Sequence, residues 1–194
     1  MIKFDATKLA AVAIAQSNEE TRYYLKGVYF EGDIAVATDG NILTASQDTE
    51  SVNDAPGIYP ISKKAHAAMK KRGALCVVIQ DDVLTVLDDQ ERTTHMEPCK
   101  PIDGTFPNWK QVIPKEIGVP NESAFSAIVM GKLISTAVTL SGNKAATFRI
   151  TGITGNAQNV SYAQSDTISV AMPYRNAIVP NLPVWALAEV SKAA

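Results

Sequence analysis

The feature that most constrains the fold of this 194-residue chain is a plan of elements that recurs three times: a short strand, a helix, and then several strands. The three units occupy residues 2–46, 57–114 and 124–175. Each unit can bury the apolar side of its helix against its own strands, so repetition predicts an internally duplicated α+β fold. We expect helices on one face of antiparallel sheets.

Turn and capping residues set the expected boundaries. Asp5 or Thr7 can cap the first helix and Ser62 the second, while Gly142 ends the third. Gly32-Asp33 and Asp81-Asp82 are hairpin signals. Helices are expected over 6–17, 62–73 and 131–141, and strands over 2–5, 23–31, 34–38, 58–61, 75–80, 83–87, 92–97, 125–130, 146–151, 159–164 and 167–172.

Domain boundaries follow from breaks in this plan. Residues 1–114 form the first predicted domain, and 124–175 form a half or reduced domain. Proline and glycine between them predict a linker over 115–123. Residues 176–194 contain two prolines outside the repeat and are expected to form a C-terminal tail.

Composition narrows the class of protein. The chain is 46% hydrophobic and 20% charged, which is typical of a globular protein. Its two cysteines are too far apart to indicate a disulfide framework, and no apolar run reaches the length of a membrane span. We expect a cytoplasmic protein. With a net charge of −2, any DNA-binding surface must concentrate its positive charge locally.

The second predicted helix concentrates such charge. At 100° per residue its lysines at 63, 64, 70 and 71 fall within an arc of roughly 120°, opposite Ala65, Ala68 and Met69. Lysines this close repel each other unless an anion answers them, and DNA phosphate would do so without reading sequence. A solvated surface is the alternative interpretation.

The other two helices carry less charge. In the third, Lys132 shares a polar face with hydroxyl residues, which is compatible with a DNA channel and equally with an ordinary surface. The first helix offers only Lys8. The candidate DNA-binding residues are therefore Lys8, Lys63, Lys64, Lys70, Lys71 and Lys132.

Signatures of catalysis are missing. The two histidines show no metal-ligand spacing, and no nucleophile elbow, phosphate loop or metalloprotease motif occurs. The paired aspartates at 81–82 and 88–89 lie beside predicted strands, where turn chemistry explains them better than a metal site. We expect neither an enzyme nor a cofactor.

Four segments, in order, resemble the bacterial DNA polymerase III beta subunit, the sliding clamp. Residues 21–31 (TRYYLKGVYFE), 36–43 (VATDGNIL) and 102–114 (IDGTFPNWKQVIP) resemble its middle domain, and residues 170–175 (VAMPYR) resemble the end of its last domain. The resemblance implies a shortened clamp, which suggests a phage-encoded form. Asn41, Ile42, Gln111 and Tyr174 depart from the family pattern, which has His, Arg, Arg and Met there.

In that family, helices line a ring around double-stranded DNA, and a hydrophobic pocket receives peptide motifs of polymerases and clamp loaders. The resemblance therefore implies a processivity factor with these partners. The alternative is a clamp mimic that binds partner peptides or modulates a host clamp without encircling DNA. The pocket positions implied are Leu25, Thr38, Gly40, Leu43, Pro107, Val112, Val170, Met172, Pro173 and Arg175.

The number of units bears on ring closure. A clamp ring contains six domains of two units each, whereas this chain carries three units. If third units pair about a two-fold axis, four chains complete a ring. If the third unit is a reduced domain, the ring is a trimer.

Overall fold

The computed structural model describes residues 1–113, 125–146, 149–151, 158–161 and 166–173. The predicted linker and tail lie outside these residues. The described α-helices are α1 (Ala6–Ala13), α2 (Lys63–Met69) and α3 (Ala127–Ser141), and short 3-10 helices form η1 (Tyr23–Leu25) and η2 (Trp109–Gln111). The strands are β1 (Ile2–Asp5), β2 (Val28–Glu31), β3 (Ile34–Thr38), β4 (Ile42–Gln47), β5 (Val52–Asn53), β6 (Gly57–Tyr59), β7 (Ala74–Gln80), β8 (Val83–Asp88), β9 (Thr93–Pro98), β10 (Arg149–Thr151), β11 (Gln158–Ser161) and β12 (Thr167–Ala171).

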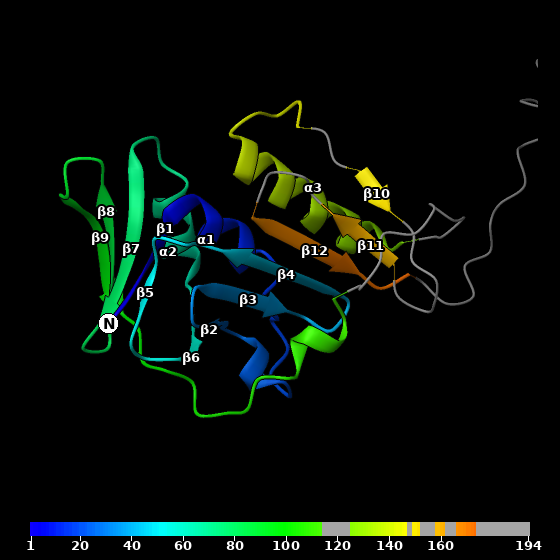
Figure 1. The fold of residues 1–194 in the computed structure, drawn as a ribbon, viewed down its shortest axis with the longest axis horizontal. Helices are drawn as coiled ribbons and strands as arrows, with labels where there is room; N and C mark the ends of the chain where they lie inside the picture. Colours follow the sequence, from blue (N-terminus) through cyan, green and yellow to red (C-terminus); the bar gives the residue numbers. More distant parts are fainter. Residues whose placement is uncertain (114–124, 147–148, 152–157, 162–165, 174–194) are drawn as a thin grey trace, which may run out of the picture.

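Two antiparallel sheets interlock the first two units. One sheet has the order β5-β1-β7-β8-β9 and the other β10-β11-β12-β4-β3-β2-β6. Strand β1 leaves its own unit to pair with β7, and β6 crosses the other way to pair with β2. This exchange makes residues 1–113 one interlocked body and confirms the predicted α+β class (Figure 1).

The third unit extends the sheet of the first. Strand β12 runs antiparallel to β4 from Thr167 opposite Ser46 to Ala171 opposite Ile42. Helix α3 packs against α1. One sheet edge of the third unit is therefore paired within the chain, and β10 is the outermost described strand on the other side.

The main core lies between the helices and the sheets. Helix α1 contacts both α2 and α3, and six of its eight residues are buried. The ring of Phe30 meets Phe4 and Tyr59 edge to face, with centroids 5.8 and 5.9 Å away. Burying a phenylalanine or leucine side chain stabilises the fold by roughly 1.5–3 kcal/mol, so this layer holds both sheets together.

The predicted caps are present. The Asp5 carboxylate accepts a hydrogen bond from the Lys8 amide at 2.7 Å, and the Ser62 hydroxyl accepts from the Lys64 and Ala65 amides at 3.1 and 3.0 Å. Gly142 ends α3 with a φ of 64°, a conformation that costs glycine little.

Several predicted boundaries were wrong. The strand expected over 125–130 is the start of α3, because the Ser126 hydroxyl caps the Val129 amide at 3.2 Å. Helix α1 stops at Ala13 and α2 at Met69, short of the expected 17 and 73. The strand expected from residue 23 begins at Val28, after η1, and a Cβ on the intervening Gly27 would lie 2.8 Å from the Tyr59 carbonyl oxygen. Close packing against β6 therefore leaves no room for a side chain between η1 and β2.

Among the described residues, no helix is long and apolar enough to cross a membrane.

Candidate functional site

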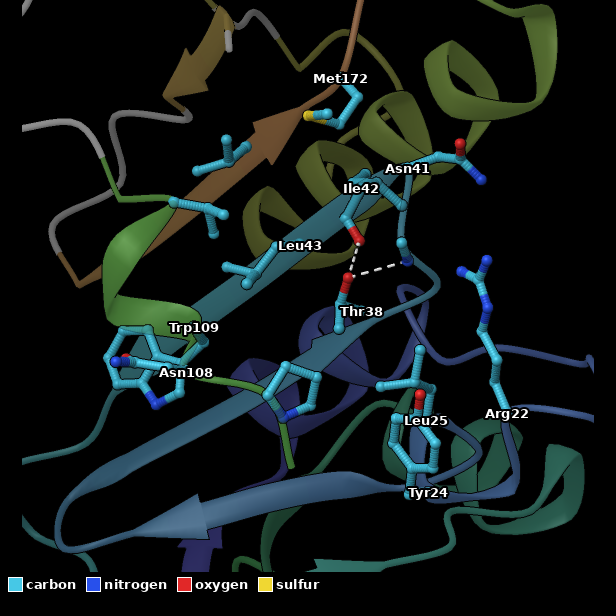
Figure 2. Close-up of a pocket in the computed structure, with 14 residues that line it drawn as sticks. Arg22, Tyr24, Leu25, Thr38, Asn41, Ile42, Leu43, Asn108, Trp109 and Met172 are labelled. Atoms are coloured by element: carbon cyan, nitrogen blue, oxygen red, sulfur yellow. Dashed lines mark hydrogen bonds between the residues drawn. The ribbon is translucent and has the colours of Figure 1, made fainter. Parts of the chain in front are cut away.

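An apolar pocket of about 290 Å³ opens on the seven-stranded sheet (Figure 2). Side chains on this face, including Val36 and Leu43, form a second hydrophobic cluster, whereas Ala35 and Ala37 belong to the main core. Because neighbouring strand residues point to opposite faces, the pocket and the helix layer lie on opposite sides of the sheet. Its lining residues are Arg22, Tyr24, Leu25, Thr38, Gly40, Asn41, Ile42, Leu43, Pro107, Asn108, Trp109, Val112, Val170 and Met172.

A tight turn between β3 and β4 forms one wall. The Thr38 hydroxyl donates to the Ile42 carbonyl at 2.8 Å and accepts from the Gly40 amide at 3.0 Å. Asp39 Oδ1 accepts from the Asn41 and Ile42 amides at 2.8 and 3.0 Å. Gly40 has a φ of 91°, and a Cβ there would lie 2.6 Å from the Arg22 guanidinium. Glycine therefore permits both the turn and the position of Arg22.

The third unit supports this turn from two sides. Lys132 Nζ on α3 donates to Asp39 Oδ2 at 2.7 Å and to the Gln16 carbonyl at 3.2 Å. The Met172 amide donates to the Asn41 carbonyl at 2.8 Å. The pocket is thus completed only when residues far apart in sequence fold together.

The segment after β9 forms the opposite wall. Glu31 on β2 accepts hydrogen bonds from Trp109 Nε1 at 3.2 Å and Lys110 Nζ at 2.8 Å. The hydrogen bond from Lys110 lowers the pKa of the Glu31 carboxyl, which keeps it ionised. The Phe106 ring stacks on Tyr29 with centroids 5.0 Å apart. These contacts hold the Pro107–Val112 stretch over the sheet.

The chemistry of this pocket suits an apolar peptide anchor. Leu25, Leu43 and Val170 are buried, while Val112 and Met172 are 40% and 41% exposed. Arg22 is the only charged side chain among the described residues that line the pocket. A linear segment with apolar side chains can exclude water here, and Arg22 can meet an acidic or carbonyl group at the rim.

The structure gathers eight of the ten predicted pocket positions around this cavity: Leu25, Thr38, Gly40, Leu43, Pro107, Val112, Val170 and Met172. Pro173 is described but is not part of the lining, and Arg175 lies outside the described residues. The prediction missed Arg22, Tyr24, Asn41, Ile42, Asn108 and Trp109. All six belong to the segments that carry the resemblance, so their neighbours in sequence were the available signal.

The predicted lysine stripe lies on the exposed side of α2 and the following turn. Lys63, Lys64, Lys70 and Lys71 are all exposed. None of them forms an ion pair with another residue that the structure describes. Because the helix ends at Met69, the last two lysines belong to its C-cap and the turn beyond it. We call these four residues the lysine face.

Lys8 and Lys132 are placed differently. Lys8 Nζ donates to the Gln47 carbonyl at 2.8 Å and lies 3.2 Å from the Asp166 carboxylate and 3.8 Å from Asp48. Lys132 is engaged with Asp39, and its side chain is only 20% exposed. Both lysines therefore have internal partners that a phosphate would have to displace.

The paired aspartates form turns. Asp81 and Asp82 both adopt positive φ, 51° and 60°, as a tight hairpin between β7 and β8 requires. Asp88 is bound by Arg92, whose guanidinium lies 2.8 Å away and lowers the pKa of the Asp88 carboxyl. In the part of the chain that the structure describes, no group of His, Cys, Asp or Glu side chains could hold a metal ion.

Comparison with solved structures identifies the fold. The chain is similar to DNA polymerase III subunit beta from Borrelia burgdorferi (15% identity, TM-score 0.62, 91% of this chain and 63% of that one) and from Thermotoga maritima (13%, 0.60, 90% and 65%). It is also similar to the DNA polymerase sliding clamp from Bacillus subtilis (14%, 0.57, 91% and 64%). The chain therefore spans less than two thirds of each of these proteins. No protein-family model matches the sequence, and no curated protein matches it significantly.

Proposed function

We propose that this protein, which has the sliding-clamp fold, is a processivity factor that encircles double-stranded DNA and tethers a replication protein. The observation that carries the proposal is that the lysine face and the apolar pocket lie on different parts of the molecule. Helix α2, which packs against the five-stranded sheet, presents four exposed lysines without ion-pair partners among the described residues, whereas the apolar pocket opens on the seven-stranded sheet. One molecule can thus hold DNA and a peptide at the same time.

The DNA contact would be electrostatic and independent of sequence. Lysine ammonium groups bind phosphates as point charges, and each contact releases counterions from the duplex. Such contacts are individually weak and are exchanged easily between successive phosphates. A ring held on DNA by its topology can therefore slide while remaining attached.

Ring closure would require several copies of the chain. Three units per chain make four chains equivalent to a twelve-unit ring, and a reduced third domain makes three chains sufficient. Strand β9 borders the five-stranded sheet and β10 the seven-stranded sheet, so both offer backbone groups for pairing among the described strands. Which of these sheet edges pair between chains would decide whether the ring is a tetramer or a trimer.

The test of the DNA function combines mass with topology. Light scattering coupled to size-exclusion chromatography is expected to give a trimer or tetramer. The oligomer, assembled on a nicked circular plasmid by a loader or at high concentration, is expected to co-elute with the circle and to be released when a restriction enzyme linearises it. If the oligomer dissociates from the intact circle as fast as from the linearised plasmid, it does not encircle DNA.

The peptide function has its own test. The pocket would take an aliphatic or aromatic anchor from a polymerase or clamp-loader peptide. A Met172→Glu substitution places a charge at the half-exposed rim and is expected to weaken a fluorescent clamp-binding peptide at least ~10-fold, since a buried charge needs a partner. Met96→Glu, at a 61% exposed position on β9, is the matched control and should leave peptide affinity unchanged.

A non-encircling clamp mimic is a second candidate. The described lining of the apolar pocket is already concave and apolar within one chain, so peptide capture would not depend on ring closure. A stable monomer that binds the peptide normally but leaves circular DNA freely would support the mimic over the clamp.

A further inference from the structure

A second pocket, of about 210 Å³, lies where the helices meet, and we call it the helix-junction pocket. The end of α1 contributes Ala13 and its C-cap Ile14, the segment after it contributes Gln16, and the start of α2 contributes Lys63 and His66. Lys132 reaches it from α3, and Lys26 from the loop after η1. It therefore collects side chains from every α-helix of the described chain and continues the lysine face inward.

The charged side chains that line this pocket are all basic. Its described lining contains Lys26, Lys63 and Lys132 as well as His66, and none of it is acidic. Lys26 pairs with Glu20, whose side chain is 89% exposed, and Lys132 pairs with Asp39, which is not part of the lining. Lys63 has no ion-pair partner among the described residues. A concave site with this lining favours an oxyanion.

His66 is held in one orientation. Its Nε2 lies 3.0 Å from the Ala10 carbonyl oxygen, near the C-terminal end of α1. A carbonyl can only accept, so Nε2 carries the hydrogen. The remaining ring nitrogen, Nδ1, is an acceptor in the neutral ring and becomes a donor when the ring is protonated.

The surroundings of His66 disfavour the protonated ring. Burial lowers the pKa of His66, the Ala10 carbonyl partly opposes this, and the Lys70 charge one helical turn away lowers it further. Lys63, which has no ion-pair partner among the described residues, lines the same pocket. An anion placed among these groups would reverse the balance and favour the imidazolium ring.

Among the described residues, the strands that pack against α2 place no carboxylate without a partner beside His66. Glu97 on β9 accepts hydrogen bonds from the Ser62 hydroxyl at 2.8 Å and from His95 Nε2 at 2.9 Å. Cys76, the titratable side chain of β7, lines a different pocket, and Asp88 of β8 is bound by Arg92. A bound oxyanion would therefore be the main negative charge that His66 meets.

We propose that the helix-junction pocket binds one phosphodiester of the DNA backbone through Lys63 and His66, and that His66 takes up a proton on binding. This inference rests on the proposed function, because it assigns the occupant of the pocket to the same DNA. On this proposal the contact made by His66 depends on protonation of its ring, whereas the lysines carry their positive charge throughout.

The two histidines of the chain make the test direct. The ring proton signals of His66 and His95 are followed by NMR against pH, with and without a short DNA duplex. The pKa of His66 is expected to rise when the duplex is bound, and the ring signals of His95, on β9, serve as the internal reference. A Lys63→Ala variant should diminish the rise at His66, whereas Lys100→Ala, on an exposed loop, should not.

Affinity gives a second readout. From pH 7.5 to 6.0, binding of the duplex should tighten roughly 3- to 10-fold in the wild-type protein, since a rise of one pKa unit is worth a factor of ten. His66→Gln can still donate to Ala10 and should lack this extra gain. Bound duplex with an unchanged His66 pKa overturns the pocket assignment and leaves the clamp function standing, whereas absence of any duplex binding removes both. A rise with inorganic phosphate but not with bound duplex overturns the assignment to DNA.

Discussion

Helices α2 and α3 were predicted at equivalent places in the repeat, yet their exposed faces differ in kind. The face of α2 and its following turn carries four exposed lysines, whereas α3 exposes Ile128 at 74% and Ile134 at 49%. The lysine of α3, Lys132, is turned inward to Asp39. The comparison teaches that lysines on two helices of one fold can serve different ends: α2 leaves its lysines exposed, and α3 uses Lys132 to hold the turn at the apolar pocket.

The sharpest way to break this comparison is to remove the lysine face. Replacing Lys63, Lys64, Lys70 and Lys71 together with glutamine is expected to weaken DNA binding ~100-fold or more at moderate salt. The slope of log K against log salt should fall by up to about 3.6, because each phosphate that is no longer neutralised reduces it by about 0.9. Fluorescence anisotropy across a salt series measures both.

The control for that experiment is a pair of exposed lysines elsewhere. Lys100→Gln with Lys144→Gln changes charge to a smaller extent outside the lysine face. If this pair weakens binding as much per lysine as the four substitutions do, the contact is a diffuse charge effect and α2 has no special role.

Lys132 should matter to stability more than to DNA. A Lys132→Met substitution leaves the Asp39 carboxylate, 15% exposed, without its cation and is expected to cost about 1–3 kcal/mol of unfolding free energy. Urea denaturation measures the destabilisation, and Lys144→Met provides the exposed control. An unchanged denaturation midpoint would show that the pair contributes no net stability.

Adding charge to α3 tests whether it faces the same DNA. Ile128→Lys with Ile134→Lys adds two cations at exposed positions and is expected to tighten duplex binding a few-fold, because each new phosphate contact adds to the electrostatic attraction. The matched control, Ile128→Gln with Ile134→Gln, adds polarity without charge. Unaltered affinity for the duplex in the lysine variant would mean that the exposed face of α3 does not lie near the DNA.

The smallest expected effect concerns His66 and stability. The folded state lowers the pKa of His66 below its ordinary value of 6.5, so the unfolded chain binds a proton that the folded chain resists. Stability should therefore fall as pH drops through 6.5. The urea midpoint of His66→Gln should decrease less between pH 7.5 and 5.5, and equal decreases in both proteins would contradict the assignment.

Local chemistry made much of the fold predictable. The caps at Asp5 and Ser62 and the Asp81-Asp82 hairpin depend on neighbours within four residues, and the structure confirms all three. The start of α3 was missed because its first turn, residues 127–130, is an apolar run that periodicity alone does not separate from a strand. The length of α2 was overestimated because the exit at Met69 leads into the turn before β7.

The residues of the candidate sites also divide into those that local spacing could place and those that only long-range contacts place. Lys63 and Lys64 could be placed on an exposed face from helical spacing, since their side chains need only project away from Ala65 and Met69. Lys132 has the same spacing signal, but its partner Asp39 is 93 residues away. The segments that line the apolar pocket could be named only through a resemblance, because periodicity does not say which loops meet.

By itself the sequence determined the helix caps, the hairpin turns and the charge of α2, because each depends on groups close together along the chain. Only the tertiary structure decided that β1 and β6 exchange units, that β12 extends the sheet of the first unit, and that His66 lies against Ala10 in a cationic pocket. These outcomes depend on long-range pairing, in which several partners satisfy the same backbone groups and packing selects among them.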